Sequence, residues 1–250
     1  MSTNTQSSFG LTATALSLGV ISAGAWAALL LMSAMGGMAM AMSPWATTTL
    51  AYMFVMWLVM MVAMMVPSTV PMVAMMRKII SNKHDGREAV FRTALFVGGY
   101  LGVWAGFSIA ATVVQSGLQQ GALLSPMLAG TSTFFTGLLF FAAGLFQFSR
   151  LKTACLEYCR SPLGFFLASW QTGRWGALRM GLSHGSFCLG CCWALMVLLF
   201  TFGVMNLVWV FVLSAVVLIE KLSPFGLVWS RMMGVVLIAG GTSTMIYSAL

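Results

Sequence analysis

The amino-acid sequence predicts an all-α membrane protein, a bundle of about seven transmembrane helices. Two properties of its composition indicate this fold class: 60% of the 250 residues are hydrophobic and only 6% are charged. Soluble domains carry about 25% charged residues, so this chain could not cover a surface that faces water. The third observation is a series of long apolar runs, many of them close to the ~20 residues that a helix needs to cross the hydrocarbon. Soluble enzymes, disordered proteins and nucleic-acid binders are therefore excluded.

The apolar runs are continuous, which favours helices over the alternating strands of a membrane barrel. The sixth run is short and follows the fifth directly after Phe202-Gly203, so we expect a tight hairpin there. The runs cover residues 11–33, 46–75, 92–115, 128–148, 181–203, 206–220 and 228–248, each to within a few residues.

The positive charges predict how the helices are oriented. All twelve Lys and Arg residues fall in or beside alternate connections of the predicted bundle. Cytoplasmic loops carry an excess of these residues, so the sequence predicts a cytoplasmic N-terminus and an outside C-terminus in a bacterial cytoplasmic (inner) membrane. The net charge of +8 then reports topology and no nucleic-acid partner. We expect a single transmembrane domain over residues 1–250, with a short cytoplasmic interfacial segment at about 149–180.

The fifth run carries the most specific candidate site. It contains His184, Cys188, Cys191 and Cys192, which fit within an arc of about 100° at the helical spacing of about 100° per residue. Gly185 and Gly190 would let other helices approach this one closely. A single buried Cys is usually just a small hydrophobic residue, but three of them with a His on one stripe favour a metal site.

The second run adds thioethers. Met53, Met56, Met60 and Met64 share one face of the expected helix, and an adjacent stripe holds Met61, Met65 and Met72. Pro67 and Pro71 remove two backbone donors, so a kink or local unwinding is expected; broken helices often border binding sites in transporters. The alternative is that these Met residues only fill gaps in the core. Further Met residues lie at the outer end of the first run and in the following loop: Met32, Met35, Met38, Met40 and Met42.

Four other polar residues are secondary candidates. Cys155 and Cys159 share one helix face on the expected cytoplasmic side, where a permanent disulfide is disfavoured. Glu220 is the single acid inside a predicted membrane segment, which makes it a functional candidate, although pairing with Lys or lipid headgroups is the simpler interpretation. Asn206 lies at the opposite end of the same segment and could cap it.

The donor atoms indicate the metal. Soft thiolate and thioether ligands select Cu(I), and Cys with His also suits zinc. The Met-rich surroundings favour copper, with zinc as the alternative. The sequence therefore predicts a soft-metal site built from Cys188, Cys191, Cys192 and His184 together with Met60, Met61, Met64 and Met65.

Several motifs together resemble the bacterial family of predicted metal-binding integral membrane proteins, which is of unknown function. The resemblance runs from Trp57 to about Gly234 and implies metal binding. It rests on Trp57, Met60, Ala63-Met64-Met65-Val66-Pro67, Pro71-Met72, Lys152, Cys155-Leu156, Cys159-Arg160-Ser161-Pro162, Cys188-Leu189-Gly190-Cys191-Cys192-Trp193, Leu195-Met196, Gly203-Val204-Met205-Asn206 and Glu220-Lys221.

Three functions are compatible with these features. The first is a copper-handling membrane protein that transports Cu(I) or delivers it to a membrane cuproenzyme. The second is an intramembrane thiol or metal oxidoreductase, because Cys188 and Cys191 form a Cys-x-x-Cys pair. The third is an accessory subunit or assembly factor of a larger membrane complex. No ATP-binding loop, phosphate cradle or Ser-His-Asp arrangement is present, so ATP-driven transport by this chain alone is not expected. The sequence leaves enzymatic activity open and leans against it. Expected partners are the lipid bilayer, a membrane or periplasmic protein, and further copies of the chain.

Overall fold

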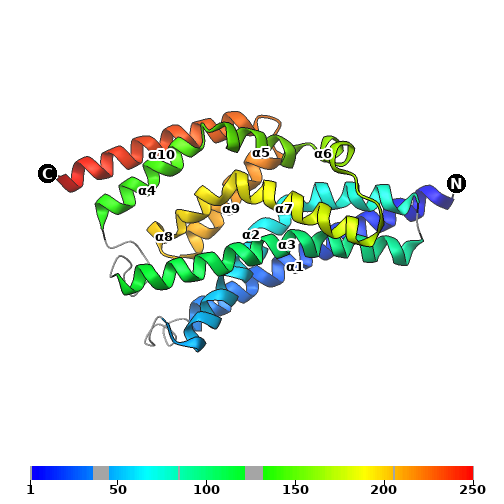
Figure 1. Ribbon diagram of the computed structural model, residues 1–250, viewed down its shortest axis with the longest axis horizontal. Coiled ribbons are helices and arrows are strands. Elements are labelled where there is room, and N and C mark those ends of the chain that lie inside the picture. Colours follow the sequence, from blue (N-terminus) through cyan, green and yellow to red (C-terminus); the bar gives the residue numbers. More distant parts are fainter. Residues whose placement is uncertain (1, 36–44, 84, 122–131, 205, 250) are drawn as a thin grey trace.

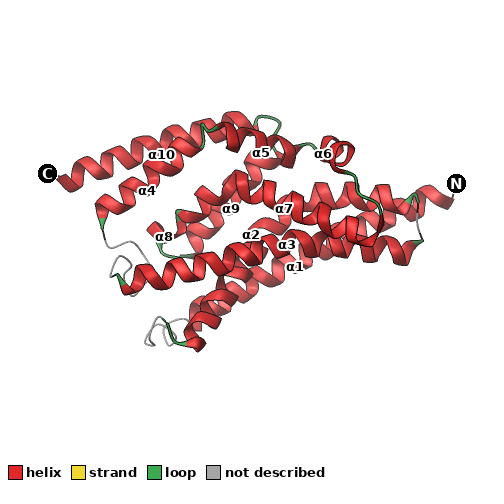
Figure 2. Ribbon diagram, in the orientation of Figure 1, coloured by secondary structure: helices red, strands yellow, loops and turns green. Residues whose placement is uncertain are grey.

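The computed structural model describes residues 2–35, 45–83, 85–121, 132–204 and 206–249. Within them every regular element is a helix, which confirms the all-α prediction (Figure 2). The helices are α1 Ser2–Met35, α2 Thr47–Ser81, α3 Gly86–Gln120, α4 Thr133–Phe146, α5 Arg150–Arg160, α6 Pro162–Ser169, α7 Gly173–Val197, α8 Leu199–Phe202, α9 Leu207–Leu222 and α10 Gly226–Ala249.

The long helices form two groups that share one bundle (Figure 1). Helices α1, α2, α3 and α7 pack in sequence through the pairs α1–α2, α2–α3 and α3–α7. Helices α4 and α10 pack mainly against each other, and α9 lies against α2, α10 and α5. The short α5 packs against α7 and α9, so it links the two groups. The buried core is continuous through the centre and contains most of the sulfur atoms of α2 and α7.

The predicted count of seven transmembrane helices is not exact. In the described residues, four helical segments are long and apolar enough to cross a membrane: Leu11–Ala34, Thr47–Ser81, Gly86–Gln120 and Gly173–Phe202. A fifth span results if α4 and α5, which are bent by 63°, count as one. The sixth apolar run does form α9, but its 16 residues extend only about 24 Å. That length is shorter than the ~30 Å of hydrocarbon, so α9 alone is too short to count as a span.

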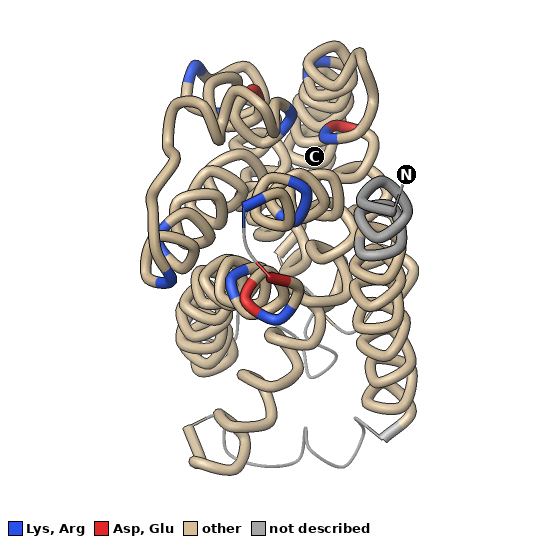
Figure 3. Tube along the Cα trace, turned by 90° about the vertical axis from the view of Figure 1, so that its right-hand side faces the viewer, with Lys and Arg blue, Asp and Glu red and all other residues tan. Residues whose placement is uncertain are grey.

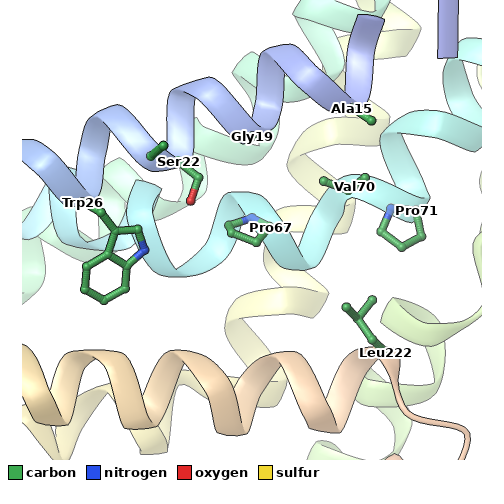
Figure 4. A pocket seen from close by; sticks show the side chains of 9 residues that line it. Ala15, Gly19, Ser22, Trp26, Pro67, Val70, Pro71 and Leu222 are labelled. Atoms are coloured by element: carbon green, nitrogen blue, oxygen red, sulfur yellow. The ribbon is translucent and has the colours of Figure 1, made fainter. Parts of the chain in front are cut away.

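Helix α2 continues through both of its prolines, so the predicted unwinding does not occur. Pro67 leaves the carbonyl of Ala63, four residues earlier, without its helical donor. The hydroxyl of Ser22 in α1 donates to that carbonyl at 3.1 Å. Ser22 and Pro67 lie side by side at a cavity of about 510 Å³ between α1, α2 and the end of α9 (Figure 4). A neighbouring helix thus replaces the missing bond, as membrane interiors require.

Removing this hydroxyl tests that explanation. We expect Ser22→Ala to lower the free energy of unfolding by about 0.6–1.7 kcal/mol, the range of interhelical hydrogen bonds in membranes. Unfolding in mixed micelles, followed by tryptophan fluorescence, measures the change. Ser33→Ala is the control, because among the described residues the Ser33 hydroxyl bonds only to Leu30 in its own helix. Equal effects of the two substitutions would contradict a special role for Ser22.

Helices α3 and α7 cross at close range because glycines lie at their contact. A Cβ atom on Gly181 would clash with the backbone of Phe96, and one on Gly99 would clash with the carbonyl of Leu178. One turn further along, a Cβ on Gly185 would lie 2.9 Å from Val103 Cγ2. The sequence prediction that Gly185 admits a neighbouring helix is therefore confirmed, and this crossing brings Tyr100 to the cysteines of α7.

The turn after the fifth run is as tight as expected. Phe202 ends α8, Gly203 adopts the left-handed φ of +92°, and the amide of Asn206 donates to the Gly203 carbonyl at 2.9 Å. A side chain is strained at such a φ, which explains a glycine here. Asn206 occupies the N-cap position of α9, but its side chain makes no capping hydrogen bond.

The segment 149–180, predicted to be interfacial, forms two short helices, α5 and α6, and the start of α7. Its cations do not all mark topology. Lys152 is 1% exposed, and Arg160 donates to the carbonyls of Ser223 and Pro224 after α9. The Arg174 guanidinium pairs with Glu88 at 3.0 Å and ties the start of α7 to the start of α3. Figure 3 looks onto the end where the N-terminus lies and shows Lys and Arg of several helices.

Candidate metal centre

The cysteine stripe of α7 faces the interior of the bundle. Cys188, Cys191 and Cys192 are each at most 1% exposed, and His184 is 3% exposed. The thiols of Cys191 and Cys192 both donate to the carbonyl of Cys188, at 3.1 and 2.8 Å. A carbonyl is a modest partner for a thiol, so these sulfur atoms keep their lone pairs for other ligands. The arc expected from helical spacing is therefore present and buried.

Helix α5 brings the other two cysteines to the same place. Cys155 packs on Gly190 of α7, where an added Cβ would lie 2.7 Å from the Cys155 sulfur. The thiol of Cys159 lies close enough to interact with those of Cys188 and Cys191. All five cysteines are free thiols. The close approach expected at Gly190 is confirmed, and the helix that packs there is α5. We call the five residues Cys155, Cys159, Cys188, Cys191 and Cys192 the thiol cluster.

The methionines of α2 line the same core. Met60, Met61, Met64 and Met65 are at most 1% exposed and belong to the buried cluster that contains Cys188, Cys191 and Cys192. Met72 and Met76 are equally buried but belong to a second apolar cluster with Phe96 and Phe165. The predicted outer series is only partly described. Met32 packs against the core, whereas the side chain of Met35 and all of Met38, Met40 and Met42 lie outside the described residues.

His184 is held by rings on three sides. It stacks on Phe96 and Tyr100, with ring centroids 5.9 and 5.4 Å apart, and meets the edge of Phe165. Its Nε2 lies 3.3 Å from the hydroxyl of Thr69 in α2. Its Nδ1 is buried without a hydrogen-bond partner among the described residues. A buried ring nitrogen without a partner is costly, and a metal ion is one partner that would satisfy it.

A lysine that the sequence analysis did not name as a site residue lies against the thiol cluster. Lys221, near the end of α9, is 7% exposed. Its Nζ donates to the sulfur of Cys188 at 2.8 Å and to the hydroxyl of Ser68 at 3.1 Å. The sequence signal that could have indicated this role was the position of Lys221 next to the intramembrane Glu220. The contact itself could not be predicted, because it joins residues 33 positions apart on two helices.

Tyr100 was also missed. Its hydroxyl donates to the carbonyl of Met65 at 3.1 Å and lies 3.2 Å from the Cys188 sulfur. Ser68 donates to the same carbonyl at 2.9 Å. The backbone of α2 beside the prolines therefore fixes the hydroxyl groups that surround Cys188. A single tyrosine within the apolar run 92–115 was the only sequence signal for this role.

Glu220 pairs with a partner from another helix, as its simpler interpretation predicted. Lys152 Nζ lies 2.6 Å from Glu220 Oε2, and the two side chains are 1% and 2% exposed. The other carboxylate oxygen, Oε1, has no hydrogen-bond partner among the described residues. Asn206 is different. It lies exposed at the far end of α9, away from the thiol cluster.

The donor set fits a soft metal ion. Buried thiols, thioethers and an imidazole with a free nitrogen are the ligand types that bind Cu(I), and thiols must lose a proton to do so. The adjacent ammonium of Lys221 is suited to support a thiolate. Within the described residues, no group of three or more His, Cys, Asp or Glu side chains is already arranged around a metal position. The cavity near Pro67 and Pro71 contains no candidate ligand.

Comparison with known proteins identifies the family. No curated protein and no solved structure matches the chain. A family model described as a copper chaperone, PpoB2, matches residues 54–244, well over half of the 250 residues. The matched region contains the thiol cluster and the α2 methionines. The description agrees with the metal-binding resemblance of the motifs, and it names copper and not zinc. The chain belongs to the PpoB2 copper chaperone family.

Proposed function

We propose that the protein binds Cu(I) within the membrane and delivers it to a cuproenzyme of the same membrane. The observation that carries this proposal is the meeting of cysteines from α5 and α7 beside the buried methionines of α2. Membership of a copper chaperone family supports the choice of metal. Cys188 and Cys191 are the proposed primary ligands. Cys159, Cys192 and the free Nδ1 of His184 complete the set of donors.

The residues suggest how Cu(I) moves. On α2, Met56, Met60 and Met64 are buried and follow one another at about 6 Å along the helix. Thioethers bind Cu(I) weakly and thiolates bind it more strongly. The ion would therefore pass from the methionines to the thiol cluster by exchange of ligands. Within that cluster, Cys155 and Cys159 lie on the short helix α5 and not on α7. They would accept Cu(I) in turn and present it to a partner.

Copper binding by the purified protein tests this proposal. We expect about one tightly held Cu(I) per chain under anaerobic, reducing conditions, measured by elemental analysis and competition with bathocuproine disulfonate. Cys188→Ser and Cys191→Ser should each weaken the affinity by more than about 100-fold, because losing a ligand costs at least as much as losing its supporting partner, which costs 10–100-fold. Met64→Leu should weaken it less.

Two variants serve as controls. Ser186→Ala changes α7 at an exposed position, and Met76→Leu changes a buried methionine outside the core that holds the cysteines. Both should retain the affinity of the unmodified protein. Absence of bound copper in a folded, reduced sample would contradict the proposed function. Equal losses in Met64→Leu and Met76→Leu would contradict the role of the α2 stripe.

We also propose that the protein lies in a bacterial inner membrane with its N-terminus in the cytoplasm. The support is that cations of α2, α3 and α7 lie at one end of the bundle, where the Glu88–Arg174 pair links α3 to α7. Reporter enzymes fused to either terminus measure this orientation. A C-terminal alkaline phosphatase should be active and an N-terminal one inactive, and the reverse pattern would contradict the proposal.

A further inference from the structure

A buried, positively charged side chain lies against the proposed primary ligand. Lys221 Nζ is 2.8 Å from the Cys188 sulfur and is oriented by Ser68 at 3.1 Å. Lys near a membrane surface usually extends its ammonium group toward water. Here the side chain is 7% exposed and points into the bundle. The position of the charge is therefore set by the fold.

No carboxylate among the described residues neutralises this ammonium group. The adjacent Glu220 is engaged by Lys152 at 2.6 Å, and Lys152 comes from α5. Lys152, Lys221 and Glu220 together carry one net positive charge at this end of α9. That charge falls on the thiol cluster, where Cys188 is its acceptor. A metal ion held by Cys188 and Cys191 would thus lie within a few ångströms of a fixed cation.

We propose that Lys221 makes the site selective for a monovalent metal ion. The repulsion between Lys221 and a bound ion is proportional to the charge of the ion, so a divalent ion experiences twice the repulsion that Cu(I) does. Low dielectric in the membrane interior makes this difference large. The same lysine neutralises the excess negative charge of a Cu(I) ion with two thiolates. The inference rests on the proposed function, and it assigns metal selectivity to a residue that does not ligate.

Metal affinities can distinguish a role of Lys221 in selectivity from a purely structural role. If Lys221 only anchored Cys188 and Ser68, its loss would weaken every metal to a similar extent. If its charge discriminates, the ratio of two affinities must change. Lys221→Met removes the charge at nearly constant size, Lys221→Gln removes it while keeping a donor, and Lys221→Arg keeps the charge. Lys78→Met removes an equal charge from an exposed position of α2.

The experiment compares Cu(I) and Cd(II) in detergent-purified protein. Cu(I) affinity is measured by competition with bathocuproine disulfonate, and Cd(II) affinity by the thiolate-to-metal absorbance band. We expect Lys221→Met and Lys221→Gln to raise the ratio of Cd(II) to Cu(I) affinity at least tenfold. Lys221→Arg and Lys78→Met should leave it within about threefold of the unmodified protein, because their charge near the site is unchanged.

Each result bears on the inference. An unchanged ratio in both Lys221→Met and Lys221→Gln overturns it, and so does an equal change in Lys221→Arg. If only one neutral variant folds, that variant alone decides the matter. Failure of the unmodified protein to bind Cu(I) would instead contradict the proposed function, so the two failures are distinguishable.

Discussion

Glu220→Leu is expected to lower the free energy of unfolding by about 3–5 kcal/mol, because it leaves the ammonium group of Lys152 buried without its counter-ion. The two side chains meet at 2.6 Å and are 1% and 2% exposed. The pair joins α5 to α9, so its loss should also separate Cys159 from the cysteines of α7. Unfolding by SDS in mixed micelles measures the stability, and bathocuproine competition measures the Cu(I) affinity.

The double variant Lys152→Met with Glu220→Leu is the decisive control. Replacing both members of a buried ion pair by apolar side chains of similar size is often neutral or stabilising. We therefore expect the double variant to recover most of the stability that Glu220→Leu loses. A double variant as unstable as the single one would show that the charge of Lys152 is not the cause. The cost would then come from packing.

Gly181→Leu is expected to disrupt the crossing of α3 and α7. A Cβ atom at this position clashes with the backbone of Phe96, which cannot rotate away as a side chain could. Overpacking a core costs about 1–3 kcal/mol and sometimes more, and here two helix backbones must separate. His184 and Cys188 follow on the same helix, so Cu(I) affinity should fall together with stability. Thermal unfolding and bathocuproine competition detect both effects.

Gly106→Ala provides a matched control on α3. Nothing lies within 4 Å of a Cβ atom at Gly106, so the substitution adds no clash. Alanine has a higher helix propensity than glycine by about 1 kcal/mol, and we expect Gly106→Ala to preserve or raise stability. Comparable damage from Gly106→Ala and Gly181→Leu would refute the close crossing.

Local patterns in the sequence predicted the helices and placed the α7 cysteines on one helix face. Where the structure describes them, the apolar runs form helices, since backbone groups in lipid must bond within their own segment. The arc of His184 and the α7 cysteines followed from helical spacing alone. Gly185 and Gly190 were expected to admit other helices, and α3 and α5 do pack there.

Contacts between distant segments were not predictable in this way. The number of spans was too high because α4 and α9 are apolar yet only 14 and 16 residues long, and α10 is not among the described helices apolar enough to cross a membrane. Lys152 and Lys221 looked like topology markers because sequence shows a charge but not its partner. Their roles depend on where α9 ends relative to α5 and α7, and only the packed bundle determines that. The same holds for Tyr100, whose hydroxyl reaches the Cys188 sulfur from α3.

The position of Lys221 late in the chain also determines when the site can form during synthesis. The ribosome makes α5 and α7, with all five cysteines, before it makes Lys221. Until α9 has inserted, the thiols of α7 have neither their cation nor the Lys152–Glu220 link that fixes α5. A nascent chain therefore has its five thiols before it has the ammonium group that contacts Cys188. Copper loading as proposed here belongs to the finished protein, after its last helices have entered the membrane.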